Sequence, residues 1–134
     1  MRVAGWTAEL WITPGGRIRP DEPPAAALAR EIEEETGLSG IIPGPEIWVR
    51  HATFVVNGRD QREKERFFLV PSSRFEPATA RLEPAERDCF REFRWWSVEE
   101  ISRSKECFAP QRLAELLLLL QREGPPISPL ETGA

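Results

Sequence analysis

Three glutamates stand at a spacing that could hold metal ions. Glu31, Glu34 and Glu35 occupy positions i, i+3 and i+4 of one segment. If that segment is a helix, the three carboxylates share one face. Like charges this close repel each other by roughly 0.2–0.5 kcal/mol per pair on a bare helix. Crowded carboxylates are the ligands that hard cations such as Mg²⁺ or Mn²⁺ require, so the cluster predicts a cation site.

The alternative is a solvated acidic helix face, and the run of residues 33–35 taken alone favours it. A helix built only for stability would place lysines among these glutamates. No lysine lies between Arg17 and Gly37, and Arg30 directly adjoins the cluster. The surrounding residues therefore favour chemistry over solvation.

The segment that must position these glutamates is predicted to be a helix over residues 24–36. Proline is tolerated in a first helical turn, and Gly37 stands where a left-handed C-cap is expected. Asp21 and Pro23 precede the helix, with Pro23 at the usual N-cap position. Apolar residues recur at three- and four-residue spacing, as on a helix packed against a core: Ala25, Leu28, Ala29 and Ile32.

The rest of the chain reads as strands, turns and a second helix. Asn57-Gly58 is a strong hairpin turn signal. We expect an extended segment or strand over 3–12, strands over 46–56, 66–70 and 91–97, a loop over 71–86, a short helix from 98 to 102, a helix at about 110–122 and an irregular tail over 124–134. This pattern predicts a single α+β domain over residues 1–134, an α/β/α sandwich with a mixed β-sheet between helices.

Composition limits the partners. The 134 residues carry a net charge of -4, which argues against a nucleic-acid binder. Cys89 and Cys107 have no metal-ligand spacing and are expected to be reduced thiols. The leucine run 116–120 is too short to span a bilayer, and no secretion signal is visible. We expect no membrane contact and a cytoplasmic location.

The glutamates belong to a longer pattern. Gly16 is followed after five residues by Glu22, and then, at fixed spacing, by Arg30-Glu31-Ile32, Glu34-Glu35 and Gly37-Leu38. The preceding residues are Trp11-Ile12-Thr13-Pro14-Gly15-Gly16. Residues 16–38 resemble the Nudix box at every defined position, and the preceding segment resembles its Trp-x-x-Pro-Gly-Gly lead-in. The segment 94–101 is similar to the C-terminal half of many bacterial members, more weakly.

The resemblance implies metal-dependent hydrolysis with Mg²⁺ or Mn²⁺. It implies that Glu31, Glu34, Glu35 and the Gly16 carbonyl hold the metal, with one glutamate as base. Gly15 and Gly16 would let the backbone turn sharply. Arg30 would orient the carboxylates, and Glu22 would buttress the loop. The family often adds a downstream glutamate as ligand or base; Glu63, Glu65, Glu83 and Glu86 are candidates. We favour Glu65 as ligand or Glu86 as catalytic group, and a plain surface role stays open for each.

Substrate contacts are expected from the strand 46–56 and its neighbour. Trp48 and Phe54 could stack on a base, although core packing is the alternative. Arg50, Arg62 and Arg66 could hold distal phosphates, with solvated surface as the alternative. Trp95 and Trp96 are expected in the sheet core and at its edge.

Nudix domains usually place a strand and a hairpin before the box, whereas residues 1–14 leave room for one strand. Three explanations stay open: a natural chain that starts upstream, a second subunit that supplies strands in a homodimer, or a reduced sheet. The expected activity is pyrophosphohydrolysis of a nucleoside diphosphate linked to another moiety, such as ADP-ribose, a nucleotide sugar, a dinucleoside polyphosphate or a nucleoside triphosphate. A catalytically impaired Nudix-fold binding module is the alternative.

Overall fold

The chain forms two compact units, each built from two separate segments. The computed structural model describes residues 1–4, 9–78 and 90–133, with backbone alone for residues 2–4, 54, 56, 90 and 91. The first unit comprises Met1–Gly44 and Val70–Trp95, and the second comprises Pro45–Leu69 and Trp96–Ala134. Helices and strands mix in one chain, which confirms the α+β class. The single domain stays a prediction.

Two strands, not one, precede the glutamate helix. β1 (Arg2–Ala4) and β2 (Glu9–Ile12) pair antiparallel, and the Ile12 amide donates to the Met1 carbonyl at 2.7 Å. The prediction of one extended segment was wrong because two short strands satisfy each other's backbone groups, which a lone strand cannot do.

β5 (Phe90–Glu92) pairs antiparallel with β1 and is shorter than the strand predicted over 91–97. Trp95 lies beyond it and is 41% exposed. Its indole Nε1 donates to the Phe75 carbonyl at 2.9 Å, and the two rings meet edge to face with centroids 5.3 Å apart. Trp95 therefore packs on an irregular segment rather than on a strand.

α1 (Pro24–Thr36) begins and ends where the sequence predicted. Pro23 occupies the N-cap without a side-chain hydrogen bond, and Pro24 is in the first turn. Gly37 adopts φ 79°, and its amide donates to the Glu33 carbonyl at 2.9 Å, which closes the helix.

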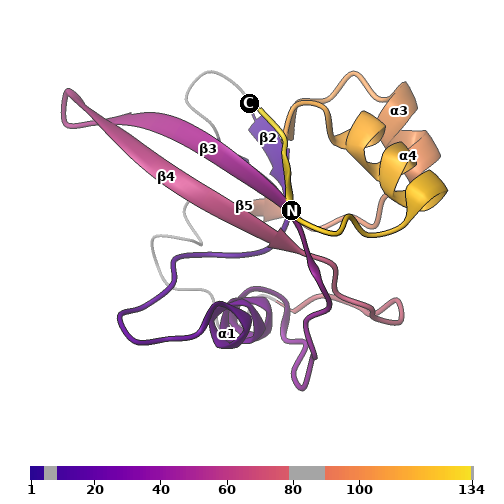
Figure 1. Ribbon diagram of the computed structural model, residues 1–134, viewed down its shortest axis with the longest axis horizontal. Coiled ribbons are helices and arrows are strands. Elements are labelled where there is room, and N and C mark those ends of the chain that lie inside the picture. Colours follow the sequence, from indigo (N-terminus) through magenta and orange to yellow (C-terminus); the bar gives the residue numbers. More distant parts are fainter. Residues whose placement is uncertain (5–8, 79–89, 134) are drawn as a thin grey trace. The chain divides into compact units, whose positions relative to one another are not determined.

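A long antiparallel hairpin dominates the second unit (Figure 1). β3 (Glu46–Val56) has the predicted bounds, and β4 (Arg59–Phe68) pairs with it along its length. Asn57 and Gly58 both have positive φ, at 51° and 74°, as a two-residue type I′ turn requires. The expected start of the second strand at residue 66 was wrong. The tight turn places Arg59 opposite Val56, so pairing begins there despite the charged residues.

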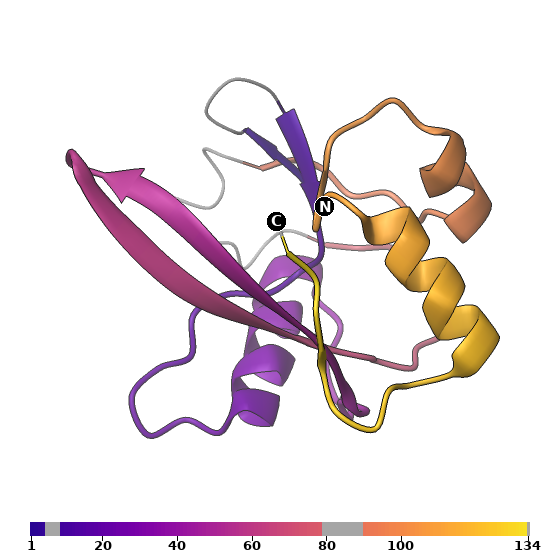
Figure 2. The ribbon, with the colours of Figure 1, turned by 45° about the horizontal axis from the view of Figure 1, so that its top comes forward.

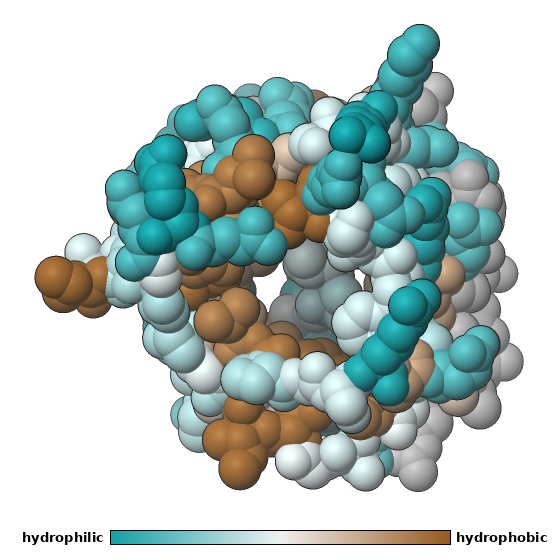
Figure 3. All heavy atoms as spheres, turned by 90° about the vertical axis from the view of Figure 1, so that its right-hand side faces the viewer, coloured by the Kyte–Doolittle hydropathy of each residue, from teal (hydrophilic) through white to brown (hydrophobic). Residues whose placement is uncertain are grey.

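Two helices follow in the second unit. α3 (Val98–Arg103) is closed by a capping box in which Ser97 and Glu100 bond each other's backbone. After β6 (Phe108–Ala109), α4 (Leu113–Glu123) starts later than predicted because the Leu113 amide bonds the Pro110 carbonyl in a preceding turn. Figure 3 views the molecule from the side of these helices, and long hydrophilic side chains stand out from that face.

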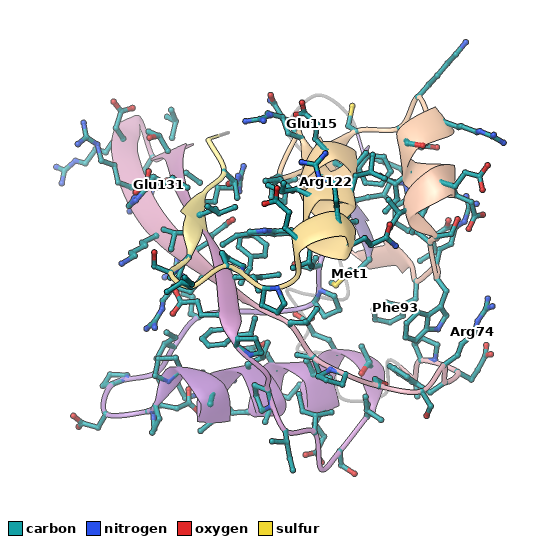
Figure 4. All side chains as sticks on the ribbon, turned by 45° about the vertical axis from the view of Figure 1, so that its right-hand side comes forward. Met1, Arg74, Phe93, Glu115, Arg122 and Glu131 are labelled. Carbon is teal, nitrogen blue, oxygen red and sulfur yellow. The ribbon has the colours of Figure 1, made fainter. Side chains whose placement is uncertain are left out.

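The tail after α4 returns to the hairpin (Figure 2). β7 (Leu130–Glu131) pairs parallel with β3, and the Thr132 amide donates to the Val49 carbonyl at 2.9 Å. Glu131, labelled in Figure 4, lies on this strand, with its carboxylate 3.5 Å from Nε2 of His51. The predicted irregular tail was wrong here, because β3 offers unpaired backbone groups that the tail satisfies. Antiparallel and parallel pairing make this sheet mixed, as predicted.

The core of the second unit joins the hairpin to both helices. Trp48 is 3% exposed and contacts Phe67 with ring centroids 5.9 Å apart. Trp96 packs edge to face on Phe108 at 5.3 Å. The buried cluster consists of Ile47, Trp48, Ile101, Leu113 and Leu116. In the described part of the chain, no helix has both the length and the apolar character needed to cross a membrane.

Candidate functional site

Two of the three spaced glutamates lie on the buried face of α1. Glu31 is 8% exposed and Glu35 is 2% exposed. Both follow Ala27 at intervals of four residues, and Ala27 is 3% exposed. This excludes the solvated acidic face for Glu31 and Glu35. Because burying a carboxylate costs free energy unless it is hydrogen-bonded or paired, each of these two glutamates needs a partner within the fold.

The Pro-Gly-Gly segment lies directly against these carboxylates. The Gly15 amide donates to Oε2 of Glu35 at 2.9 Å. A Cβ added to Gly16 would collide with the carboxylate of Glu31. Neither glycine has a positive φ, so a sharp left-handed turn is not the reason for them. A side chain at Gly16 would instead displace the Glu31 carboxylate, which occupies that space.

Arg30 joins three glutamates into one network. Its Nε and Nη2 donate to the two carboxylate oxygens of Glu22, each at 2.9 Å, in a bidentate fork. Its Nη1 donates to Glu31 at 2.8 Å and to Glu34 at 3.4 Å. The orienting contacts expected of Arg30 are therefore present. A single nitrogen, Nη1, contacts both Glu31 and Glu34.

The same fork has electrostatic consequences. Hydrogen bonding to Arg30, with a second hydrogen bond from the Arg19 amide, lowers the pKa of Glu22 to about 2. In return, Glu22 first and Glu31 second raise the pKa of Arg30 above its ordinary value. At neutral pH, Glu22 is therefore negatively charged and Arg30 is positively charged.

The loop between Gly16 and α1 is pinned by backbone contacts. Nη2 of Arg30 donates to the Arg17 carbonyl at 3.0 Å. The Arg19 amide donates to Oε1 of Glu22, and the Glu22 amide donates to the Arg19 carbonyl, both at 3.1 Å. Asp21 has φ 62°, a left-handed conformation that aspartate tolerates better than most residues. The left-handed turn before Glu22 therefore tolerates Asp21.

The donor set fits a hard divalent cation in its chemistry. Glu31, Glu34 and Glu35 supply carboxylate oxygens from one helix, and the Gly16 carbonyl is the further donor that the resemblance implies. Across residues 1–4, 9–78 and 90–133, however, no three His, Cys, Asp or Glu side chains gather closely enough to hold a metal ion. Arg30 stands between Glu31 and Glu34, and Glu35 turns to Gly15. The metal ligands stay a prediction.

The predicted substrate residues belong to the second unit, which is described by itself. Trp48 is buried in the core of this unit. Core packing was the alternative to base stacking for this residue. Nη1 of Arg50 pairs with Oε2 of Glu65 at 2.7 Å across β3 and β4. Arg66 forms a fork on Glu46 at 3.0 and 2.7 Å, which lowers the pKa of Glu46. Both arginines and Glu65 are therefore held in pairs within the hairpin.

Three predicted residues lie outside what the structure describes: Glu83 and Glu86 wholly, and Phe54 in its side chain. Sequence reasoning did not single out Arg19, whose Nη2 lies 3.8 Å from Oε1 of Glu34. The only signal for it was an arginine close behind the two glycines. Nor did it find Glu46, the partner of Arg66.

Comparison with known proteins gives one family. The family described as NUDIX domain matches residues 2–123. Diphosphoinositol polyphosphate phosphohydrolase 3-beta of Homo sapiens is 30% identical over 120 residues, which are 88% of this chain and 65% of that protein. Diphosphoinositol polyphosphate phosphohydrolase 3-alpha of Mus musculus is 28% identical over 120 residues, again 88% of this chain and 65% of that protein. Diphosphoinositol polyphosphate phosphohydrolase 2 of Rattus norvegicus is 50% identical over 32 residues, 24% of this chain and 18% of that protein.

The chain therefore spans slightly less than two thirds, 65%, of the length of the longer matches. No solved structure matches the chain.

Proposed function

Because the chain belongs to the Nudix family, with the family match covering residues 2–123, we propose that it is a metal-dependent hydrolase of phosphoanhydride bonds. The observation that carries the proposal is the burial of Glu31 and Glu35, at 8% and 2% exposed, against Gly15 and Gly16. A binding module that holds no cation has no need to crowd three mutually repelling carboxylates on one helix.

In this proposal, Glu31, Glu34, Glu35 and the Gly16 carbonyl hold Mg²⁺ or Mn²⁺. When bound, the cation stabilises negative charge on the phosphate oxygens and makes a water molecule more acidic. One carboxylate accepts the proton of the attacking water, and Glu34 is our choice because it is the most exposed of the three, with 24% of its side chain accessible. Water adds to one phosphorus as the bond to the bridging oxygen breaks. Arg30 keeps Glu31 and Glu34 in position.

Two observations bear on the class of substrate. The box implies a diphosphate linked to another moiety, and we propose a nucleotide-derived small molecule. The names of the relatives point instead to a diphosphoinositol polyphosphate. Both share the anhydride, so both belong in one assay. The cytoplasmic location and the homodimer stay predictions.

The test is a hydrolysis panel with Mg²⁺ or Mn²⁺, scored by phosphate release after phosphatase coupling. It includes nucleoside diphosphate derivatives, dinucleoside polyphosphates and a diphosphoinositol polyphosphate. We expect activity with at least one class, and its loss by more than about a hundredfold in the Glu34→Gln, Glu35→Gln double variant. Glu33→Gln, on the same helix but outside the i, i+3, i+4 set, is the matched control and should stay active.

An inactive chain that still binds metal would instead support the impaired binding module. Equal activity in the double variant and the control would show that Glu34 and Glu35 take no part in catalysis.

A further inference from the structure

One cation beside the glutamates is not used by the mechanism above. Nη2 of Arg19 lies 3.8 Å from Oε1 of Glu34, and 58% of the Arg19 side chain is exposed. Arg30 already donates to the other oxygen of Glu34, Oε2, at 3.4 Å. Glu34 therefore contacts two arginines, the largely buried Arg30 and the exposed Arg19.

The backbone of Arg19 is fixed although its side chain is exposed. Its amide and its carbonyl both bond Glu22 at 3.1 Å, and Glu22 is held by the Arg30 fork. Pro20 follows directly, and Asp21 completes the turn at φ 62°. The guanidinium can therefore change partners only by side-chain rotation, and it stays within a side chain's reach of Glu34.

We propose that Arg19 is a specificity-determining residue that exchanges Glu34 for a phosphate of the substrate. The inference rests on the proposed function. A cation bound by Glu34 neutralises that carboxylate and repels the guanidinium. The phosphate that the substrate brings to the cation then offers the guanidinium a new anionic partner. A planar guanidinium matches two phosphate oxygens, which an ammonium group does not.

The inference defines a substrate class. Arg19 adds a positive charge at the exposed rim of the α1 carboxylates, outside the metal ligands. It therefore favours substrates with a high density of negative charge at the cleaved diphosphate, from its own oxygens or from a further anionic group beside it, over those with a neutral group there. Such substrates include nucleoside triphosphates and polyphosphorylated sugars or polyols.

Opposite effects on two ligands test this role without catalysis. Calorimetry with Mn²⁺ alone should show that Arg19→Gln binds the ion roughly two- to fivefold more tightly, because an exposed competing ion pair is gone. With Mn²⁺ present, the same variant should bind methylenediphosphonate, a diphosphate that cannot be hydrolysed, about three- to tenfold more weakly. Arg19→Lys should restore part of the diphosphonate binding.

The matched control is Arg103→Gln, which removes an exposed arginine paired with Glu99 on α3. It should change neither affinity, and thermal unfolding of all variants confirms that they fold. Arg19→Gln results equal to those of Arg103→Gln would overturn the inference and leave the proposed function intact. If the unchanged chain binds neither Mn²⁺ nor the diphosphonate, the proposed function fails and the inference fails with it.

Discussion

Replacing Gly16 by alanine isolates the contact between the loop and the glutamate helix. The added methyl would occupy the position of the Glu31 carboxylate, which is the flexible end of a side chain. Glu31 would have to move, and its 2.8 Å bond to Arg30 would lengthen or break. Gly15 offers the matched control, because a Cβ there meets nothing within 4 Å and neither glycine has a positive φ.

The magnitude follows from the difference between the two variants. Each alanine restricts the unfolded chain and thereby adds roughly 0.4–1 kcal/mol to the free energy of unfolding. At Gly16 this gain is opposed by the weakening of the partly buried hydrogen bond between Glu31 and Arg30, which costs about 1–3 kcal/mol. The unfolded-state gain cancels in the comparison. Gly16→Ala should therefore unfold about 1–3 kcal/mol more easily than Gly15→Ala, a Tm difference of about 4–12 °C in a chain this size.

Thermal and urea unfolding of the two variants measure this difference, and calorimetry with Mn²⁺ shows whether the displaced Glu31 still contributes to metal binding. We expect weaker Mn²⁺ binding only in Gly16→Ala. Equal Tm values and equal Mn²⁺ affinities would refute the reasoning, since they would show that Glu31 does not need the space above Gly16.

Two further predictions concern the same unit. The pKa of Glu22 is about 2, below its ordinary value of 4.5, so its stabilising contribution is complete above pH 4.5 and is lost as the pH falls toward 2. Glu22→Gln should therefore unfold at lower urea than the unchanged chain at pH 7, with a smaller gap at pH 3; a gap of equal size at both pH values would contradict this. Gly37 has φ 79°, and a Cβ there would lie 3.3 Å from Cβ of Ala78, whereas Gly40 at φ 70° has open space. Gly37→Ala and Gly40→Ala share the left-handed cost of about 1–2 kcal/mol, so a lower Tm in Gly37→Ala measures the crowding, and identical Tm values would argue against it.

The sequence predicted best where one local signal decides the structure. α1 runs from Pro24 to Thr36 as expected, because a proline start and a left-handed Gly37 act within a few residues. The Asn57-Gly58 turn was equally local. The same two-residue turn sets the start of β4 at Arg59. The hydrophobic pattern did not predict this start, because residues 59–66 contain too few apolar residues to be recognised as a strand.

Elements that depend on distant partners were predicted poorly. β7 is a two-residue strand that pairs with the backbone of Trp48 and Val49, far away in the chain. At the candidate site, spacing singled out the glutamates, and the family resemblance added Arg30. The burial of Glu35 and the contact between Gly16 and Glu31 depend instead on how the loop folds over α1. Likewise, the pairs that hold Arg50 and Arg66 depend on strand register, which residue types alone do not set.

β4 has a consequence for how copies of this protein behave at high concentration. Among the strands that the structure describes, it lies at the end of the order β4-β3-β7, so its outer backbone groups offer a template to a second chain. Its sequence from Arg59 to Arg66 alternates acids and bases almost without interruption. An incoming strand would have to bring these charges into register with its own, and mismatched charges would repel it. The hairpin edge is therefore protected against fibre-like stacking, and replacing Arg62 and Lys64 by valine should make the chain prone to aggregation.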